Sequence, residues 1–339
     1  MSEQRQSKKG RRSACIIGCG GIGFQFDHGR QIQGAYTHFR AFMQSPFFDI
    51  AAVAEPNAAI RSAIEQEFGI PTFEGYRDML EAVSPDVVSI AAPDHLHTGI
   101  LRACADYRPA AVLCEKPLAG SLEEACMVVE KYRAEGIGLQ VNFTRRFVPE
   151  FRRIAQLIGQ GGLGIIQHVS IYYSRGLVHN ASHYFDMLLF LFGEPDDVEV
   201  VRMREGLTAD DPTATVVLRY EGFDVVLAGM TSGTLLTNDV DIVGTEGRVQ
   251  VTTDDILVRS NVEAHPLFDR YTYFVETERT AVDRGAALPA AVDNIHAFIE
   301  DTEELLSPGA NSIRIFQLIN RIQEQPLWRN WHYSADPKR

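Results

Sequence analysis

A glycine-rich turn at the end of the first apolar run limits the fold of this chain more than any other feature. Residues 14–17 read ACII and lead directly into GCGGIG at residues 18–23. In a G-x-G-x-x-G turn, the first glycine allows the tight turn, the second lets the backbone approach a pyrophosphate, and the third lets the following segment pack closely. We therefore predict that a dinucleotide contacts Gly18, Gly20, Gly21, Ile22 and Gly23.

Residues 13–143 alternate between short apolar runs and helical patterns. Several of the apolar runs are uninterrupted, as in strands that are covered on both faces. The expected strands are 14–18, 50–54, 87–91, 111–114 and 138–141, and the expected helices are 58–68, 97–107 and 122–134. Such alternation is typical of stacked βαβ units. It predicts an α/β domain of the Rossmann type, with a doubly wound parallel sheet.

Glu55 ends the second expected strand, where a carboxylate can accept hydrogen bonds from both ribose hydroxyls of adenosine and repel a 2'-phosphate. This favours NAD over NADP as the cofactor. Glu55 follows Gly23 by 32 residues, instead of roughly 20. The excess is a polar insertion, residues 24–34, which we expect to delay the first helix to residues 36–43. The insertion is either an inert loop or a lid, and a lid would use His28 and Arg30.

The pattern changes after a glycine cluster at residues 161–164. From residue 165 to about 259 we expect longer, antiparallel strands with one inserted helix, 183–192, which Gly193 and Pro195 end. Two helices, 291–306 and 313–323, close the chain. We predict a tail at 1–12 that is disordered, a Rossmann domain at 13–143, and an α+β domain with a large, open, mostly antiparallel sheet at 144–325. The final segment either stays with this second domain or packs back on the first domain.

Charge and cysteine content exclude some classes of function. The net charge is −13, and without the +4 of the basic tail the body carries −17, which disfavours nucleic acid and anionic membrane as partners. No apolar run has the length of a membrane span, and the start lacks a signal peptide pattern. The five cysteines form no Cys-x-x-Cys pair. We expect reduced thiols and a cytoplasmic protein.

Lys116 lies between Glu115 and Pro117, directly after the apolar run 110–114. The carboxyl end of such a strand is where open α/β sheets bind ligands, and an amine is costly to desolvate there. Alcohol oxidation by NAD needs a group that stabilises the developing alkoxide and a base that takes its proton. Lys116 fits the first role, and His183, a side chain that titrates near neutrality, fits the second.

The chain resembles the family of glucose-fructose oxidoreductase, inositol dehydrogenase and the rhizopine catabolism protein over most of residues 14–330. The segments that carry the resemblance are GCGGIG from Gly18, AEPN around Glu55, AAPDHLH from 91, CEKPLA from 114, NFTRRFVPEF from 142 and SHYFDMLLFLFGEP from 182. The resemblance implies a Rossmann domain followed by a domain whose sheet forms one wall of the active site. It further implies a homodimer or homotetramer and a sugar-like substrate, either a sugar, a cyclitol or a nucleotide-linked sugar.

The resemblance also implies roles for single residues. The lysine of the Glu-Lys-Pro segment reaches the substrate near the nicotinamide, and the bond to Pro117 is often cis. Cofactor contacts are implied for Pro93, Asp94, His97 and Glu115.

The chain departs from the family pattern Asp-x-Gly-x-His-x-x-Asp at one position. His183 and Asp186 match, with Asp186 implied to bind substrate, but His179 occupies the place of the first aspartate. Either His179 or Asn180 replaces the missing carboxylate, or the proton path differs. On one continuous helix, His179, His183 and Asp186 could instead face a metal ion; we favour a site without a metal.

Three arginines are candidate substrate clamps, because a guanidinium binds carboxylate or phosphate through two parallel hydrogen bonds. They are Arg145, Arg146 and Arg175. The favoured function is NAD-dependent hydride transfer at a secondary alcohol of a sugar or cyclitol. One alternative uses the same hydride step to eliminate a glycosidic group with NAD regenerated, and another is a sensor that binds sugar without turnover.

Overall fold

The structure is a computed structural model that describes residues 10–208, 211–231 and 236–334. Residues 1–9 of the predicted tail lie outside the described residues. The chain divides into two compact units. Unit 1 contains the chain to Val148 and returns for Arg284–Arg314, whereas unit 2 contains Pro149–Asp283 and the chain from Ile315.

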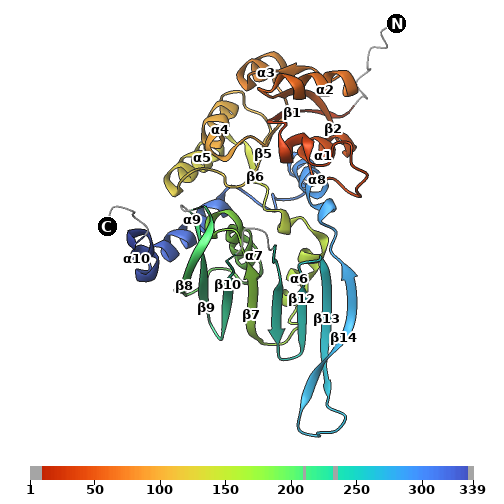
Figure 1. The fold of residues 1–339 in the computed structure, drawn as a ribbon. Coiled ribbons are helices and arrows are strands. Elements are labelled where there is room, and N and C mark those ends of the chain that lie inside the picture. Colours follow the sequence, from red (N-terminus) through yellow and green to blue (C-terminus); the bar gives the residue numbers. More distant parts are fainter. Residues whose placement is uncertain (1–9, 209–210, 232–235, 335–339) are drawn as a thin grey trace. The chain divides into compact units, whose positions relative to one another are not determined.

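Unit 1 is built on a parallel sheet of six strands in the order β3-β2-β1-β4-β5-β6, with helices on both faces (Figure 1). This is the strand order of a Rossmann domain. The chain adds strands on one side of β1 as far as β3 and then on the other side from β4, so the order reverses between β1 and β4. The strands are β1 (Arg12–Ile17), β2 (Phe48–Ala54), β3 (Thr72–Phe73), β4 (Val87–Ile90), β5 (Ala111–Cys114) and β6 (Gly138–Val141). The predicted doubly wound sheet is therefore confirmed.

Helix α2 (Ala58–Phe68) shows how capping residues set the ends of a helix in unit 1. In α2 the side chain of Asn57 accepts the N–H of Ala59 at 2.9 Å, and Gly69 ends the helix at φ 64°. Side-chain capping and a left-handed glycine are the usual limits of a helix. The other helices are α1 (His38–Gln44), α3 (Tyr76–Val83), α4 (His97–Asp106), α5 (Leu122–Glu135) and α8 (Ala287–Ile299).

The helix predicted at 291–306 is wrong in its second half. Helix α8 ends at Ile299, and Asp301 adopts a left-handed backbone at φ 54°. The amide of Asn294, on α8, takes over backbone groups of the following segment: it accepts the N–H of Leu306 at 2.9 Å and donates to the carbonyl of Glu304 at 3.0 Å. These side-chain bonds compete with helical ones. Leu288, Val292 and Ile295 of α8 belong to the core of unit 1.

Unit 2 contains a sheet of eight strands in the order β14-β13-β12-β11-β7-β10-β9-β8. One pair, β7 with β10, is parallel, and the remaining neighbours are antiparallel. The strands are β7 (Ile166–Tyr173), β8 (Asp197–Thr208), β9 (Asp211–Tyr220), β10 (Phe223–Gly229), β11 (Val240–Gly244), β12 (Gly247–Val251), β13 (Ile256–Ala264) and β14 (Thr272–Ala281). The predicted open, mostly antiparallel sheet is confirmed.

The sheet of unit 2 extends beyond the expected end at residue 259, to β14. Strand β14 forms an edge of the sheet. Its exposed polar residues hide the alternation of apolar and polar side chains by which a strand is predicted. Such residues are common at edges that must avoid further pairing. Helices α6 (Pro149–Gly159), α7 (Ser182–Phe192), α9 (Ala310–Gln323) and α10 (Pro326–Ser334) complete the fold. In the described part of the chain, no helix is long and apolar enough to cross a membrane.

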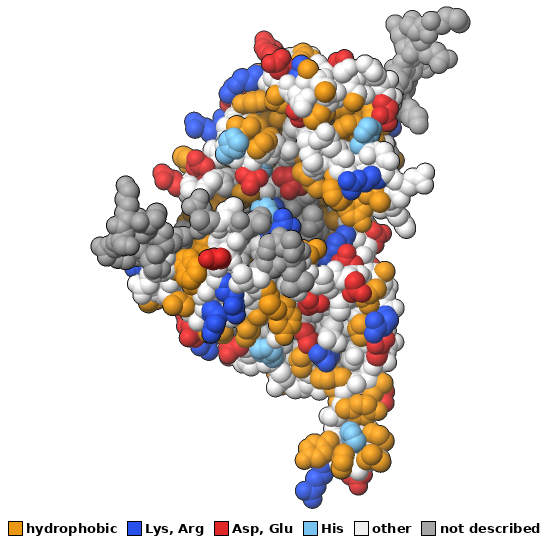
Figure 2. Space-filling model, in the orientation of Figure 1, with side chains coloured by type: hydrophobic (Ala, Val, Ile, Leu, Met, Phe, Trp, Pro, Cys, Tyr) orange, Lys and Arg blue, Asp and Glu red, His pale blue; other side chains and the backbone are white. Residues whose placement is uncertain are grey.

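The hairpin of β13 and β14 ends in a cluster of exposed apolar side chains. Leu267 is 79% exposed, and Phe268 and Tyr271 are also exposed. Figure 2 shows these hydrophobic side chains gathered at the tip of the hairpin. Exposed apolar clusters of this kind are typical of protein contact surfaces.

Candidate active site

A cavity of about 610 Å³ lies at the carboxyl ends of the strands of unit 1. It is bordered by the glycine turn after β1, by Glu55 after β2 and by Pro93 after β4. In open α/β sheets, ligands bind where the winding direction reverses, and β1 and β4 are neighbours at that position. The predicted residues that line the cavity are Gly18, Gly20, Gly21, Ile22, Glu55 and Pro93.

The glycines of the turn act in two different ways. A Cβ atom on Gly18 would come within 2.7 Å of the Ala91 carbonyl oxygen, and one on Gly23 within 2.1 Å of the Gly18 carbonyl oxygen. A Cβ on Gly20 or Gly21 would meet no atom within 4 Å. Gly18 and Gly23 therefore serve the packing of the turn, whereas Gly20 and Gly21 leave the space in front of the backbone that a pyrophosphate needs.

Glu55 is held at this turn by backbone groups. Its carboxylate accepts the N–H of Cys19 at 2.7 Å and the N–H of Asn57 at 2.9 Å. An ionised carboxylate has about four acceptor positions, so two bonds leave capacity for ribose hydroxyls. The open backbone at Gly20 and Gly21, the free acceptor capacity of Glu55 and the apolar wall together fit a dinucleotide.

The sequence analysis missed part of the cavity wall. Glu74, Gly75 and Tyr76 follow the short strand β3, and Leu96 and Ile100 lie at the start of α4. A strand of two residues gives no periodic signal, so the loop after it could not be assigned to the edge of the sheet.

The insertion after the glycine turn contributes no residue to the wall of this cavity. The turn opens only a single π-helical turn, Gly21–Gln25, and the next helix starts at His38, so the predicted delay of the helix is confirmed. The carboxylate of Asp27 closes the loop by accepting the N–H groups of Tyr36 and Thr37 at 2.8 and 3.0 Å. His28 Nε2 lies 2.7 Å from Glu67 Oε2 on α2. The geometry is that of a loop anchored at both ends.

Four predicted cofactor residues are described but do not line the cavity: Gly23, Asp94, His97 and Glu115. His97 is fully buried, and its ring nitrogens lie 2.6 Å from the Pro117 carbonyl and 2.8 Å from the Ala92 carbonyl. The Glu115 carboxylate lies 2.9 Å from His38 Nε2, and Asp94 starts the short turn before α4. The structure thus gives His97 and Glu115 bonds that hold loops, in place of a direct contact with the cavity.

Lys116 follows β5, is half-buried and precedes a cis peptide bond to Pro117. The neighbouring carboxylate of Glu115 accepts hydrogen bonds from Asn142 Nδ2 at 2.5 Å and from His38 Nε2 at 2.9 Å. Burial favours the neutral acid. The bonds from His38 and Asn142 and the charges of His38 and Lys116 outweigh that effect, so the pKa of Glu115 lies below its ordinary value.

Of the candidate clamps, Arg145 and Arg146 belong to unit 1 and Arg175 to unit 2. Arg145 and Arg146 are buried in a short turn after β6, and Arg146 Nη1 lies 3.4 Å from the Leu306 carbonyl. Arg175 is exposed in the loop after β7 and has φ 71°.

The remaining catalytic candidates belong to the loop and helix after β7 in unit 2. His179 and Asn180 lie on a single turn, Leu177–Ala181, which precedes α7. His179 is exposed, His183 is half-buried and Asp186 is buried on α7. Asn180 Nδ2 donates to the Ser174 carbonyl at 2.7 Å.

Asp211 on β9 is a residue that the sequence analysis missed. Its carboxylate accepts the N–H groups of Val178 and His179 at 2.8 and 2.9 Å. A carboxylate from another strand is therefore present beside the position that lacks the family aspartate. Among the described residues, no group of three His, Cys, Asp or Glu side chains is arranged to hold a metal ion, so the alternative site of His179, His183 and Asp186 has no geometric support.

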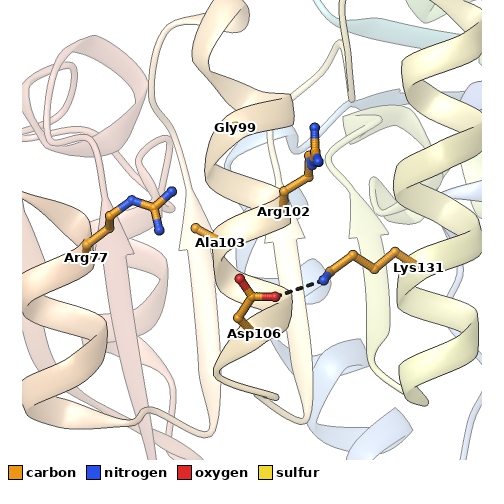
Figure 3. Close-up of a pocket in the computed structure, with 6 residues that line it drawn as sticks. All are labelled: Arg77, Gly99, Arg102, Ala103, Asp106 and Lys131. Carbon is orange, nitrogen blue, oxygen red and sulfur yellow. Dashed lines mark hydrogen bonds and ion pairs between the residues drawn. The ribbon is translucent and has the colours of Figure 1, made fainter.

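A second cavity, of about 450 Å³, lies on the outer side of α3, α4 and α5 (Figure 3). Lys131 donates to Asp106 at 2.8 Å, and this bond is the main reason why the pKa of Asp106 is lowered. The residues that line this second cavity are Arg77, Gly99, Arg102, Ala103, Asp106 and Lys131. These six residues offer no group that titrates near neutrality, and we place the chemistry at the first cavity.

Two family models match the chain. One, described as an oxidoreductase family with an NAD-binding Rossmann fold, matches residues 13–143, and the other, its C-terminal alpha/beta domain, matches residues 176–326. The chain belongs to the Gfo/Idh/MocA family of oxidoreductases. The predicted family is confirmed, and residues 13–143 carry its NAD-binding domain.

Individual proteins agree with this assignment. The rhizopine catabolism protein MocA of Rhizobium meliloti is 33% identical over 203 residues, which are 54% of this chain and 62% of MocA. An inositol 2-dehydrogenase of Rubrobacter xylanophilus is 28% identical over 258 residues, 70% of each chain. The chain thus spans less than two-thirds of the length of MocA.

Among solved structures, the WlbA dehydrogenase from Bordetella pertussis, in complex with NADH and UDP-GlcNAcA, has a TM-score of 0.73. It is 20% identical, with 96% of this chain and 97% of that chain covered. At this identity the likeness shows the fold.

Proposed function

We propose that the chain is an NAD-dependent oxidoreductase that transfers a hydride between a nicotinamide cofactor and a secondary alcohol of a sugar, cyclitol or nucleotide-linked sugar. The observation that carries the proposal is the cavity at the glycine turn, with Glu55 in its wall and Lys116 after another strand of the same sheet. The names of MocA and inositol 2-dehydrogenase support the substrate class.

NAD supplies the hydride acceptor when it is bound. In the proposed oxidation, the Lys116 ammonium donates a hydrogen bond to the substrate oxygen and stabilises its developing negative charge. His183 takes the hydroxyl proton, the carbon–hydrogen bond breaks with its electron pair, and the carbon–oxygen double bond forms. The products are a ketone or lactone, NADH and a proton.

Further residues position the reactants. We propose that Glu55 binds the adenosine ribose and selects NAD over NADP, and that Gly20 and Gly21 accommodate the pyrophosphate. Arg146, Arg175 and Asp186 are proposed to bind the substrate. His179 or Asn180 is proposed to replace the missing family aspartate.

The test is NADH formation, followed by absorbance, across a panel of sugars, cyclitols and nucleotide-linked sugars. The proposal predicts reduction of NAD with at least one member of the panel, and slower reduction of NADP. Substrate consumption that requires NAD but yields no net NADH would favour glycosidic elimination instead. Binding of panel members with no chemistry at all would contradict an enzymatic role.

We also propose a homodimer or homotetramer located in the cytoplasm. The exposed apolar tip of the hairpin between β13 and β14 supports self-association. The five cysteines form no disulfide, which fits a reducing compartment. Light scattering coupled to size-exclusion chromatography measures the oligomeric state, and a monomer at micromolar concentration would contradict this part of the proposal.

A further inference from the structure

A buried polar cluster surrounds the carboxylate of Glu115, the residue that precedes Lys116. His38, the first residue of α1, is fully buried, and its Nδ1 lies 2.6 Å from Ser89 Oγ on β4. Its Nε2 lies 2.9 Å from Glu115 Oε1, and that same oxygen accepts the bond from Asn142. The cluster of Ser89, His38, Glu115 and Asn142 thus connects a helix and three strand ends.

The donors and acceptors of this cluster fix the position of one proton. An ionised carboxylate only accepts hydrogen bonds, so His38 Nε2 must donate to Glu115. A serine hydroxyl can donate, so Nδ1 can accept from Ser89. Both ring nitrogens of His38 then have a hydrogen-bond partner, and since Ser89 and His38 have no exposed surface, water does not compete for these bonds.

The ionisation of Glu115 depends on these partners. Burial is the largest single influence and raises its pKa, whereas the hydrogen bond of His38 is the largest influence that lowers it. The titratable groups placed against Glu115 are His38 on α1 and the chain neighbours Cys114 and Lys116; Asn142 is uncharged. Burial raises the pKa of Cys114 well above 9, so this thiol stays neutral.

We propose that His38 is a positioning residue for Lys116: its Nε2–H group keeps the Glu115 carboxylate ionised and fixed, and that carboxylate holds the Lys116 side chain as an oriented ammonium. This inference rests on the proposed function of Lys116. It assigns His38 no contact with substrate or cofactor, and it explains why a fully buried histidine occupies the first turn of a helix that the insertion has delayed.

The test compares two substitutions of His38 with a control on the same helix. His38→Phe keeps an aromatic ring but removes the donor, whereas His38→Gln keeps an N–H donor and cannot carry a charge. Thr37→Ala removes the cap of α1, in which the Thr37 hydroxyl accepts from the N–H of Arg40 at 3.2 Å, but leaves the bond from His38 to Glu115 intact. The Thr37 hydroxyl also donates to Asp27 Oδ1 at 2.7 Å, so Thr37→Ala reports the combined loss of the helix cap and of this loop anchor while the bond from His38 to Glu115 is kept.

For His38→Phe we expect kcat to fall on the order of 10- to 100-fold, because small displacements of a reacting group have effects of this size, with the affinity for NAD unchanged. The acid limb of the kcat profile should move to higher pH, since burial then dominates and the pKa of Glu115 rises. His38→Gln should restore most of kcat and return the acid limb to its original position. Thr37→Ala should lower the melting temperature without changing kcat or the position of the acid limb.

A measurement without turnover separates this inference from the proposed function. With carboxyl-¹³C glutamate, NMR titration of Glu115 should show a midpoint below 4.5, its ordinary pKa, in the wild type and in His38→Gln, and a higher midpoint in His38→Phe. If the wild type turns over no substrate, the proposed function fails while this titration still decides the role of His38. Equal Glu115 midpoints in wild type and His38→Phe would overturn the inference.

A second measurement uses the wild type alone, so it tests the inference even if His38→Phe does not fold. Imidazole ¹⁵N NMR should show a proton on His38 Nε2 at pH 7. A neutral ring protonated only at Nδ1 would overturn the inference, because it could not donate to Glu115.

Discussion

The glycine turn after β1 and the Lys116 loop after β5 lie at the same edge of one sheet, yet they are built in opposite ways. The turn depends on missing side chains: Gly20 and Gly21 leave open space, and Gly18 and Gly23 allow backbones to touch. The loop depends on side chains that arrive from distant parts of the chain, such as His38 and Asn142. The first construction suits binding a large phosphate-containing ligand, and the second suits holding one charged group in place.

The largest expected effect concerns Lys116. Lys116→Ala should lower turnover on the order of 10²–10³-fold, as removal of a donor to a developing oxyanion does, while NAD still binds. Steady-state assays with the substrate found in the panel measure this. Lys131→Ala is a matched control, because Lys131 is the other lysine of the described residues and pairs with Asp106. Unchanged turnover in Lys116→Ala would remove the loop from the mechanism.

A second prediction tests whether the glycine turn is as tightly packed as its geometry indicates. In Gly23→Ala, the new Cβ would lie 2.1 Å from the Gly18 carbonyl oxygen, so the backbone must move. We expect a loss of about 3 kcal/mol in the free energy of unfolding, measured by urea denaturation. Gly99→Ala on α4, where a Cβ meets nothing within 4 Å, should instead keep or slightly raise stability. Equal stability of the two variants would contradict the packing role.

The smallest effect concerns cofactor choice at the rim of the turn. Glu55→Gln removes a negative charge from the cavity wall but keeps an oxygen for the N–H of Cys19, which now lies 2.7 Å away. The ratio of kcat/KM for NAD to that for NADP should fall by about tenfold, because repulsion of the 2'-phosphate is lost. Glu74→Gln is the control. Its side chain is 81% exposed, and solvent screening should keep its effect much smaller.

The two regions also differ in how far they could be predicted from the sequence. The turn was found because its four glycines lie within six residues directly after an apolar run, and Glu55 was found because it ends the next strand. Helix 58–68 was predicted with its observed limits from its helical pattern, and the structure shows that Asn57 and Gly69 cap it.

The cluster around Lys116 could not be predicted in this way. His38 and Glu115 are 77 positions apart, and no spacing rule joins them. Asn294 ended α8 early through its own side chain, and Asp211 reached the His179 loop from another strand. Each case is a side-chain hydrogen bond between segments whose proximity depends on the complete fold.

The central claim is that the glycine turn binds the cofactor and the Lys116 loop serves the chemistry, and calorimetric titration of NAD into two variants tests it most directly. In Gly20→Ala, whose Cβ meets no protein atom within 4 Å, the fold should be kept while the dissociation constant for NAD rises on the order of 10- to 100-fold, since the methyl group occupies the approach of the pyrophosphate. In Lys116→Ala the dissociation constant for NAD should stay within about twofold of the wild type. Lys116 is proposed to contact the substrate oxygen, so its loss should slow the chemical step and leave the binding of NAD unchanged. Unweakened NAD binding in Gly20→Ala, or its loss in Lys116→Ala, would contradict this division.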